Sequence, residues 1–183
     1  MKKYFIFIIV SLMISPLASA RGVYLSSKDF VTNAFDGNES SLKVVRLTPE
    51  SQLEIKQITG RSYPAKRIRY WKQGLRSAWI IEQIGKTEPI TVGVVIERGK
   101  ILDLKILVFR ESRGAEVRHS FFTDQFSGLN LQPELSLSDH VDGITGATLS
   151  VAAVKKVARI ALYLEQFAAS TASKPAGFLH SKK

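Results

Sequence analysis

The spacing of apolar and polar residues changes along the chain, and it predicts two helices near the beginning. A short helix is expected after Ser26, which acts as its N-cap, and Asp36-Gly37 ends it. A second helix is expected to begin at Pro49, with Thr48 as its N-cap, and to stop at Gly60. The N-terminal part of the chain is therefore predicted to supply helices before the strands begin.

Between Lys66 and Phe109 the pattern changes to that of β-strands, with runs rich in valine, isoleucine and aromatic residues. The last two runs are separated only by Arg98-Gly99, which predicts a hairpin. The expected strands are Ile68–Tyr70, Ser77–Ile84, Pro89–Glu97 and Lys100–Phe109.

The C-terminal third of the chain is expected to contain two helical stretches with a loop between them. A helix-like pattern runs from Val117 to Phe126, and residues 130–138 have the composition of a loop. The longest helix is the last, with apolar residues on one buried face and Lys155, Lys156 and Arg159 on the opposite face. These elements predict a single α+β domain, in which helices pack on an antiparallel sheet and a long helix comes last.

The first 20 residues have the pattern of a cleavable signal peptide. Lys2-Lys3 is the positive region, Phe5–Ile14 is apolar, and Ala18-Ser19-Ala20 is a small-residue cleavage site. The alternative is a membrane anchor, which needs roughly 20 apolar residues, whereas this run is shorter and is followed by a proline. We therefore expect secretion across the inner membrane, cleavage before Arg21 and a periplasmic location.

Composition and charge limit the kinds of redox site and binding partner that the chain can have. The chain has no cysteine, which excludes disulfides, thiolate metal sites and iron–sulfur clusters. Its formal net charge is +10, and six basic residues lie between Arg61 and Arg76 with aromatic residues among them. This pattern is typical of nucleic-acid binding, but an exported protein is not expected to meet nucleic acid. The alternatives are a solvated strand face, an acidic docking partner or an anionic membrane surface.

A glycine-rich segment, Asp142–Ser150, lies directly before the last helix. Its glycines and Ala147 leave the backbone open to close approach. Thr148 and Ser150 place hydroxyl groups at a helix N-terminus, where unpaired N–H groups and the helix dipole favour a phosphate. The segment suits a phosphate-bearing ligand, and the alternative is an ordinary hydroxyl cap after a glycine turn.

The same segment resembles the flavinylation motif D-x-x-[ST]-G-A-T-x-[ST] of the FMN-binding domain family. That family includes the covalent-FMN subunits of the Rnf complex and of the sodium-pumping NADH:quinone oxidoreductase. The resemblance implies that Thr148 receives FMN through a phosphoester bond, made by a dedicated flavin transferase that uses FAD and releases AMP. The other cofactor-binding positions implied within the motif are Asp142, Gly143, Thr145, Gly146, Ala147, Leu149 and Ser150.

Two further segments resemble the family, and the likeness extends from about Pro89 to Gln166. Glu111-Ser112-Arg113-Gly114 follows a strand, as does the Glu-x-x-Gly turn that borders the flavin in these domains. Glu111, Arg113 and Gly114 therefore join the implied cofactor site, and Phe122–Phe126 resembles the family's F-x-x-Q-F helix. The chain then divides into a signal peptide (1–20), an N-terminal part without assigned function (21–88), an FMN-binding region (89–169) and a disordered tail (170–183).

The function implied by the resemblance is that of an electron carrier, reduced by one membrane or periplasmic redox protein and oxidised by another. Arg113 is expected to stabilise the reduced flavin, and Glu111 either hydrogen-bonds near the ring or pairs with Arg113 at the surface. The alternatives are a flavin-dependent reductase of a small acceptor and a cofactor-free basic secreted binding protein. No H-E-x-x-H or G-x-S-x-G motif occurs, so no metal ligand and no catalytic residue is assigned.

Overall fold

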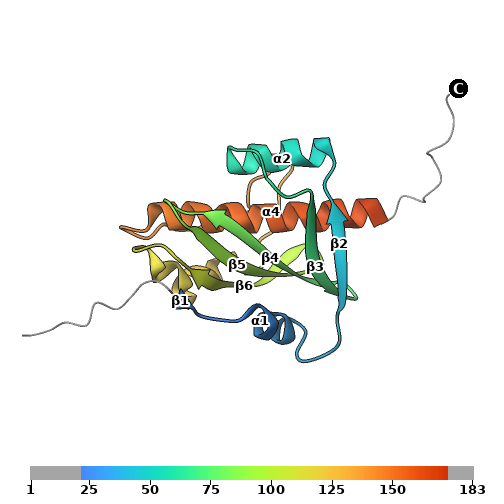
Figure 1. The fold of residues 1–183 in the computed structure, drawn as a ribbon, viewed down its shortest axis with the longest axis horizontal. Coiled ribbons are helices and arrows are strands. Elements are labelled where there is room, and N and C mark those ends of the chain that lie inside the picture. The colour runs from blue at the N-terminus through green and yellow to red at the C-terminus, as the bar shows by residue number, and fades with distance from the viewer. Residues whose placement is uncertain (1–21, 173–183) are drawn as a thin grey trace, which may run out of the picture.

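A six-stranded antiparallel sheet forms the centre of the protein in a computed structural model that describes residues 22–172 (Figure 1). Its strand order is β1-β6-β5-β4-β3-β2, so neighbours in the sheet are mostly neighbours in sequence. The strands are β1 (Gly22–Val23), β2 (Ser41–Arg46), β3 (Arg67–Gln73), β4 (Arg76–Ile84), β5 (Pro89–Glu97) and β6 (Lys100–Phe109).

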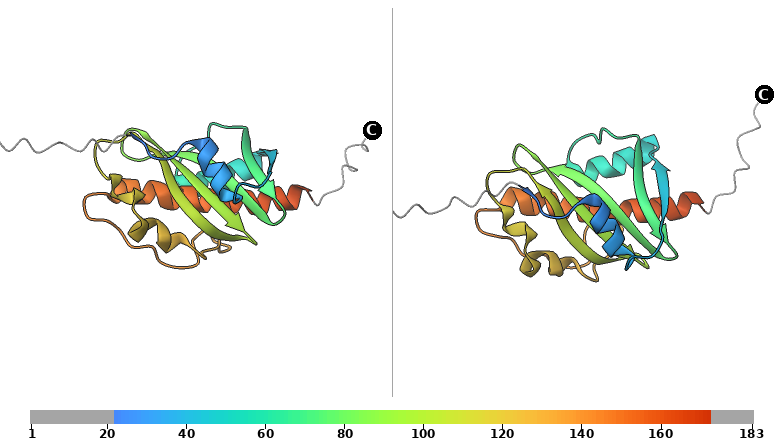
Figure 2. Two further views of the ribbon diagram at one scale, coloured as in Figure 1. Left: turned by 90° about the horizontal axis from the view of Figure 1, so that it is seen from below. Right: turned by 60° about the horizontal axis from the view of Figure 1, so that its bottom comes forward.

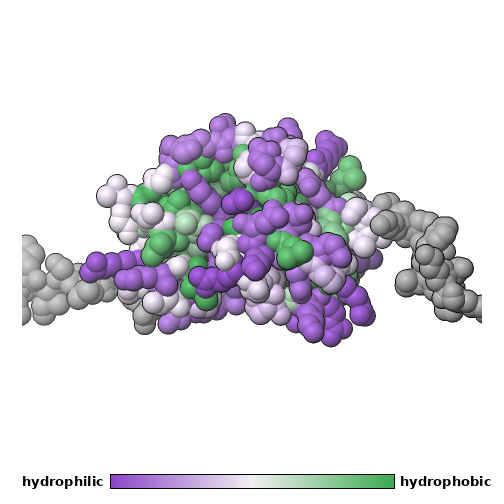
Figure 3. Space-filling model, turned by 90° about the horizontal axis from the view of Figure 1, so that it is seen from above, coloured by the Kyte–Doolittle hydropathy of each residue, from purple (hydrophilic) through white to green (hydrophobic). Residues whose placement is uncertain are grey.

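Helices cover both faces of the sheet. The longest, α4 (Thr148–Ala172), packs on β4, β5 and β6, and α2 (Pro49–Thr59) lies against α4. Helix α1 (Ser27–Ala34) crosses the opposite face and packs on β4 and β5 (Figure 2). Over the helical side of the molecule the surface is mainly hydrophilic, with smaller apolar areas between the polar groups (Figure 3). None of the helices within residues 22–172 is long and apolar enough to span a membrane.

The main hydrophobic core lies between α4 and the sheet. Trp79 of β4 is fully buried there and stacks on Tyr70 of β3, with ring centroids 4.3 Å apart. The buried carboxylate of Glu165 in α4 accepts hydrogen bonds from Ser77 Oγ (2.6 Å), Trp79 Nε1 (3.3 Å) and Lys72 Nζ (3.1 Å). Because these donors compensate the buried charge, the network fixes the position of α4 across β3 and β4.

A smaller core lies under α1 on the other face of the sheet. Phe30 packs over Gly93 of β5, where an added Cβ would come within 2.5 Å of the aromatic ring. Gly93 therefore allows the helix to approach the sheet closely.

The predicted fold class is confirmed: an α+β domain with an antiparallel sheet and a long C-terminal helix. Both early helices and the β5–β6 hairpin lie where the pattern placed them. The expected helix over 117–126 is wrong, because this stretch forms three short pieces: η1 (Ala115–Arg118), α3 (Ser120–Thr123) and η2 (Asp124–Phe126). The predicted signal peptide and most of the predicted tail lie outside the described residues, although α4 continues to Ala172.

Candidate functional site

The glycine-rich segment forms the corner at which a long loop enters α4. Thr148 is the first residue of the helix and its side chain is exposed, whereas Ala147 and Ser150 on either side are buried. The first helical bond joins Val151 N–H to the Ala147 carbonyl at 2.9 Å. The N–H groups of residues 148–150 therefore have no acceptor within the helix, and together with the helix dipole they favour an anion.

The outer side of this corner is open. A Cβ added to Gly143 or Gly146 would meet no atom within 4 Å. Gly146 also has φ +82°, a left-handed conformation that favours glycine. A ligand attached at Thr148 would thus have free space beside the backbone, so the segment fits a phosphate-linked group. The exposed residues of the segment are Asp142, Gly143, Thr145, Gly146, Thr148 and Leu149.

Two basic side chains of α4 hold the loop that leads to the corner. Lys155 Nζ donates to the carbonyl of Val141, and Arg159 Nε donates to the carbonyl of Leu135. Leu135 has φ +60°, an uncommon conformation for a branched residue, so Arg159 binds the loop at a strained point. Burial lowers the pKa of the Arg159 guanidinium below its ordinary value.

The basic residues of α4 lie on the less buried face of the helix, as the sequence pattern predicts. Lys155, Lys156 and Arg159 are half-buried, whereas the apolar residues of the opposite face are buried. Lys156 Nζ donates to the carbonyl of Thr59 at the end of α2 at 3.1 Å. The polar face of α4 is therefore covered by neighbouring segments of the chain. Their backbone carbonyls accept the hydrogen bonds that water would otherwise accept from these basic side chains.

Gln125 makes a third contact to the loop. Its Oε1 accepts a hydrogen bond from the backbone N–H of Asp142 at 2.6 Å, the first residue of the motif. Phe122 and Phe126 on either side are fully buried and pack edge to face, with centroids 5.4 Å apart. The F-x-x-Q-F segment thus anchors itself in the core through its aromatic residues and presents Gln125 to the loop.

Gly114, the last residue of the segment Glu111-Ser112-Arg113-Gly114, packs directly on the motif. Gly114 has φ +87°, and an added Cβ would lie 2.5 Å from Ser150 Oγ and 3.4 Å from the Ala147 Cβ. Two segments that the sequence separates by about thirty residues are therefore in van der Waals contact at this point. Gly114 is required both for its backbone conformation and for this close approach.

Glu111 is buried and binds the turn between β4 and β5. Its Oε1 accepts hydrogen bonds from the backbone N–H groups of Lys86, Thr87 (2.7 Å) and Glu88 (2.9 Å), and Thr87 Oγ1 donates to Oε2 at 3.2 Å. Burial raises the pKa of this carboxyl, but the hydrogen bonds together outweigh burial and hold it below the ordinary value. Arg113 is exposed, and no ion pair joins it to Glu111 in the described part of the chain.

Replacing Glu111 with glutamine is expected to lower the free energy of unfolding at pH 7 by about 1–3 kcal/mol, because three N–H groups lose a charged acceptor. The folded-state pKa of Glu111 lies below its ordinary value of 4.5. Its contribution is therefore complete above that value and disappears as the pH falls through the folded pKa. Urea unfolding of both proteins at pH 7 and pH 3 checks this. A difference between the two proteins that stays the same at both pH values would contradict it.

Replacing Lys155 with methionine is expected to loosen the motif loop without unfolding the domain. Methionine keeps the apolar stem and removes the ammonium group, which costs about 1 kcal/mol at a half-buried site. Hydrogen exchange should become faster over residues 139–147. Lys156→Met is the matched control, because it frees the end of α2 instead. Equal loosening of the motif loop in both variants would show that Lys155 does not hold it specifically.

The fold and the corner at Thr148 define an α+β domain that presents a hydroxyl group and a helix N-terminus favourable to an anion on its surface. Residues 85–163 match the model of the FMN-binding domain family, a range that includes Glu111–Gly114 and the whole motif. This match supports an FMN-binding domain within residues 85–163, with FMN as its cofactor. No curated protein and no solved structure matches the chain.

Proposed function

We propose that this protein is an exported electron carrier in which FMN is bound covalently to Thr148 through a phosphoester. The observation that carries the proposal is the position of Thr148: an exposed hydroxyl at the first residue of α4, inside the region that matches the FMN-binding domain. A flavin transferase needs access to this hydroxyl from solvent, and the open space beside Gly143 and Gly146 supplies it.

The residues of the corner have distinct roles toward the cofactor in this proposal. The first-turn N–H groups and the dipole of α4 stabilise the phosphate charge, and Gly146 leaves the backbone uncovered. The loop is held in place by the side chains of Gln125, Lys155 and Arg159. The site is therefore already ordered before FMN is attached. When bound, FMN supplies the redox chemistry, and Arg113 is proposed to favour its reduced form electrostatically.

Electron transfer between partner proteins fits the surface position of the site. A cleft of about 820 Å³ in the described structure contains no residue of the motif, and Thr148 itself is exposed. A cofactor held at an open surface is accessible to redox partners that dock beside it. Reduction of a small acceptor remains the second candidate, and turnover by the isolated protein with an artificial electron donor separates the two.

Export is proposed from the pattern of residues 1–20, and covalent attachment suits it. Free FMN lost outside the cytoplasm is not readily replaced, whereas a phosphoester keeps one cofactor for the life of the protein. The proposed electron donor and acceptor are therefore membrane or periplasmic redox proteins, and the flavin transferase acts on the exported chain.

The mature protein is expected to begin at Arg21 and to be recovered from the periplasmic fraction. The reason is the short apolar run followed by Ala18-Ser19-Ala20, which suits cleavage better than anchoring. N-terminal sequencing of protein from its native host checks this, with ultraviolet fluorescence of the band in a denaturing gel as evidence of bound flavin. Recovery of the uncleaved chain in membranes would contradict it.

A further inference from the structure

The sheet opens between β3 and β4. These strands pair only from Tyr70↔Trp79 to Gln73↔Arg76, next to their hairpin. Beyond this point β3 pairs with β2 and β4 pairs with β5, so the two halves of the sheet diverge (Figure 1). The β4 edge from residue 81 to residue 84 therefore has no strand partner on the β3 side. An unpaired strand edge presents backbone N–H and C=O groups that can pair with another chain.

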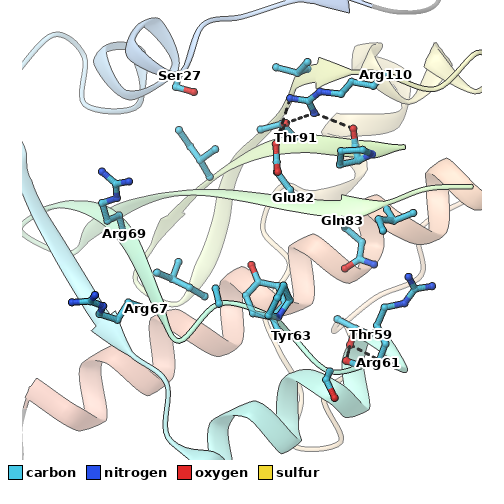
Figure 4. Close-up of a pocket in the computed structure, with 18 of the residues that line it drawn as sticks. Ser27, Thr59, Arg61, Tyr63, Arg67, Arg69, Glu82, Gln83, Thr91 and Arg110 are labelled. Carbon is cyan, nitrogen blue, oxygen red and sulfur yellow. Dashed lines mark hydrogen bonds and ion pairs between the residues drawn. The ribbon is translucent and has the colours of Figure 1, made fainter. Parts of the chain in front are cut away.

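A cleft of about 820 Å³ occupies this opening and extends toward α1. Arg67 and Arg69 project from β3 on one side of the cleft, and Glu82, Thr91 and Arg110 lie across it (Figure 4). Four arginines and one glutamate are the charged residues of the lining, which makes the cleft strongly basic. Its apolar lining includes Trp71, Ile80, Ile84 and Val108.

The positive charge of the cleft is mostly uncompensated. Arg110 is the exception: it donates to Thr91 Oγ1 at 2.9 Å and lies 3.5 Å from Glu82 Oε1. The guanidinium groups of Arg61, Arg67 and Arg69 form no ion pair or hydrogen bond with the described part of the chain, and all three residues are exposed. Only the backbone of Arg61 is bonded to a side chain, that of Thr59.

Arg67 also lies in a position that disfavours folding. It is directly opposite Arg46 on the neighbouring strand β2, and both side chains are exposed. Like charges directly opposite one another on adjacent strands are destabilising. An anionic partner bound in the cleft would compensate the repulsion between these two arginines. Without the partner, the repulsion lowers the stability of the free protein.

We infer that the cleft is a docking site for an acidic segment of a partner protein, which binds in extended conformation along the free edge of β4. The backbone of the segment would pair with residues 81–84, as in recognition by strand addition. Arg67 and Arg69 are two positions apart on one face of β3, so their side chains are separated by about 7 Å, the spacing of alternate residues on a strand. Carboxylates at alternate positions of the segment therefore match them.

A membrane surface fits these features less well than an extended segment. The cleft is concave and its apolar lining comes mainly from β3, β4, β6 and the segment before β3, whereas a bilayer offers a broad surface. The free β4 edge offers hydrogen-bond donors and acceptors, which an extended peptide can satisfy and lipid headgroups can satisfy only irregularly. The inference concerns a surface separate from Thr148, so it holds or fails independently of covalent FMN.

The test measures the binding of three labelled probes to the mature protein by fluorescence anisotropy at two salt concentrations. The first probe is a short peptide of alternating glutamate and valine, the second has the same composition with its glutamates contiguous, and the third is a phosphatidylglycerol vesicle. The first probe is expected to bind most tightly. Arg67→Glu/Arg69→Glu should weaken its binding about tenfold or more, because two favourable charge contacts become repulsive. Lys43→Glu/Lys100→Glu changes the net charge equally outside the cleft and should have much less effect.

Two further measurements separate docking from a structural role. Arg67→Glu should fold with a melting temperature equal to or above that of the wild type, because it turns the Arg46–Arg67 pair into an opposite-charge pair. Hydrogen exchange of the wild type should show protection of amides within residues 81–84 when the first peptide binds. Equal binding of both peptides, equal losses in the two double variants, unchanged exchange over 81–84, or binding of vesicles alone would each overturn the inference.

Discussion

Replacing Thr148 with alanine is expected to leave a folded protein that carries no covalent FMN. The phosphoester needs a hydroxyl oxygen, and the proposal places that oxygen on Thr148. The side chain is exposed, so its truncation removes no core contact. Loss of a hydroxyl at a helix start costs about 0.5–2 kcal/mol, which is less than the typical stability of a domain. Fluorescence of the band in a denaturing gel, with circular dichroism of the same sample, measures both effects.

Two variants at the same position provide controls. Thr148→Val keeps the branched shape without the hydroxyl and should also lose the flavin. Thr148→Ser keeps the hydroxyl and should retain it. A fluorescent band that persists in the alanine and valine variants would place the attachment on another residue.

Replacing Gly114 with alanine is expected to destabilise the domain and to prevent flavin attachment. A left-handed conformation costs an alanine about 1–2 kcal/mol, and Gly114 has φ +87°. The new Cβ would also lie 2.5 Å from Ser150 Oγ, and overpacking of this kind costs about 1–3 kcal/mol more. Because Ser150 lies in the first turn of α4, relief of the clash displaces the helix start at which Thr148 is presented.

Gly128→Ala separates the cost of the left-handed backbone conformation from the cost of the clash with Ser150. Gly128 has φ +80°, but an added Cβ there meets nothing within 4 Å. This variant should therefore lose only the conformational part of the stability and keep its flavin. Urea unfolding and gel fluorescence of both variants make the comparison. Equal destabilisation would mean that the contact between Gly114 and Ser150 has no energetic importance.

The elements with strong periodicity could be predicted from the sequence, and the others could not. The limits of the β5–β6 hairpin agree with the sequence prediction, because both strands are rich in apolar and β-branched residues and a short turn separates them. Strand β2 was missed because five of its six residues are exposed, so it has no buried alternation to detect. The stretch 115–126 carries apolar residues at helix-like spacing, but its backbone changes direction between short helical pieces.

The motif could be predicted from the sequence, whereas the contacts that position it could not. Thr148 was identified by its neighbours in the chain, which are local information. The bond between Gln125 and Asp142 spans 17 positions, and the bonds from Glu111 to the β4–β5 turn span 23–25. Such contacts depend on how the sheet and loops pack, so residue types alone do not reveal them. The basic residues of α4 illustrate this, since the sequence predicts their face of the helix but not the loop carbonyls that accept their hydrogen bonds.

The covalent link between FMN and Thr148 is tested most directly by mass spectrometry of wild-type protein purified from its native host. Expression in another host is unsuitable, because attachment requires the transferase and export. The proposal predicts that the intact mass exceeds that of the chain from Arg21 by one FMN less one water, and that fragmentation places the added mass on Thr148. An unmodified intact mass, or an added mass located on another residue, would contradict it.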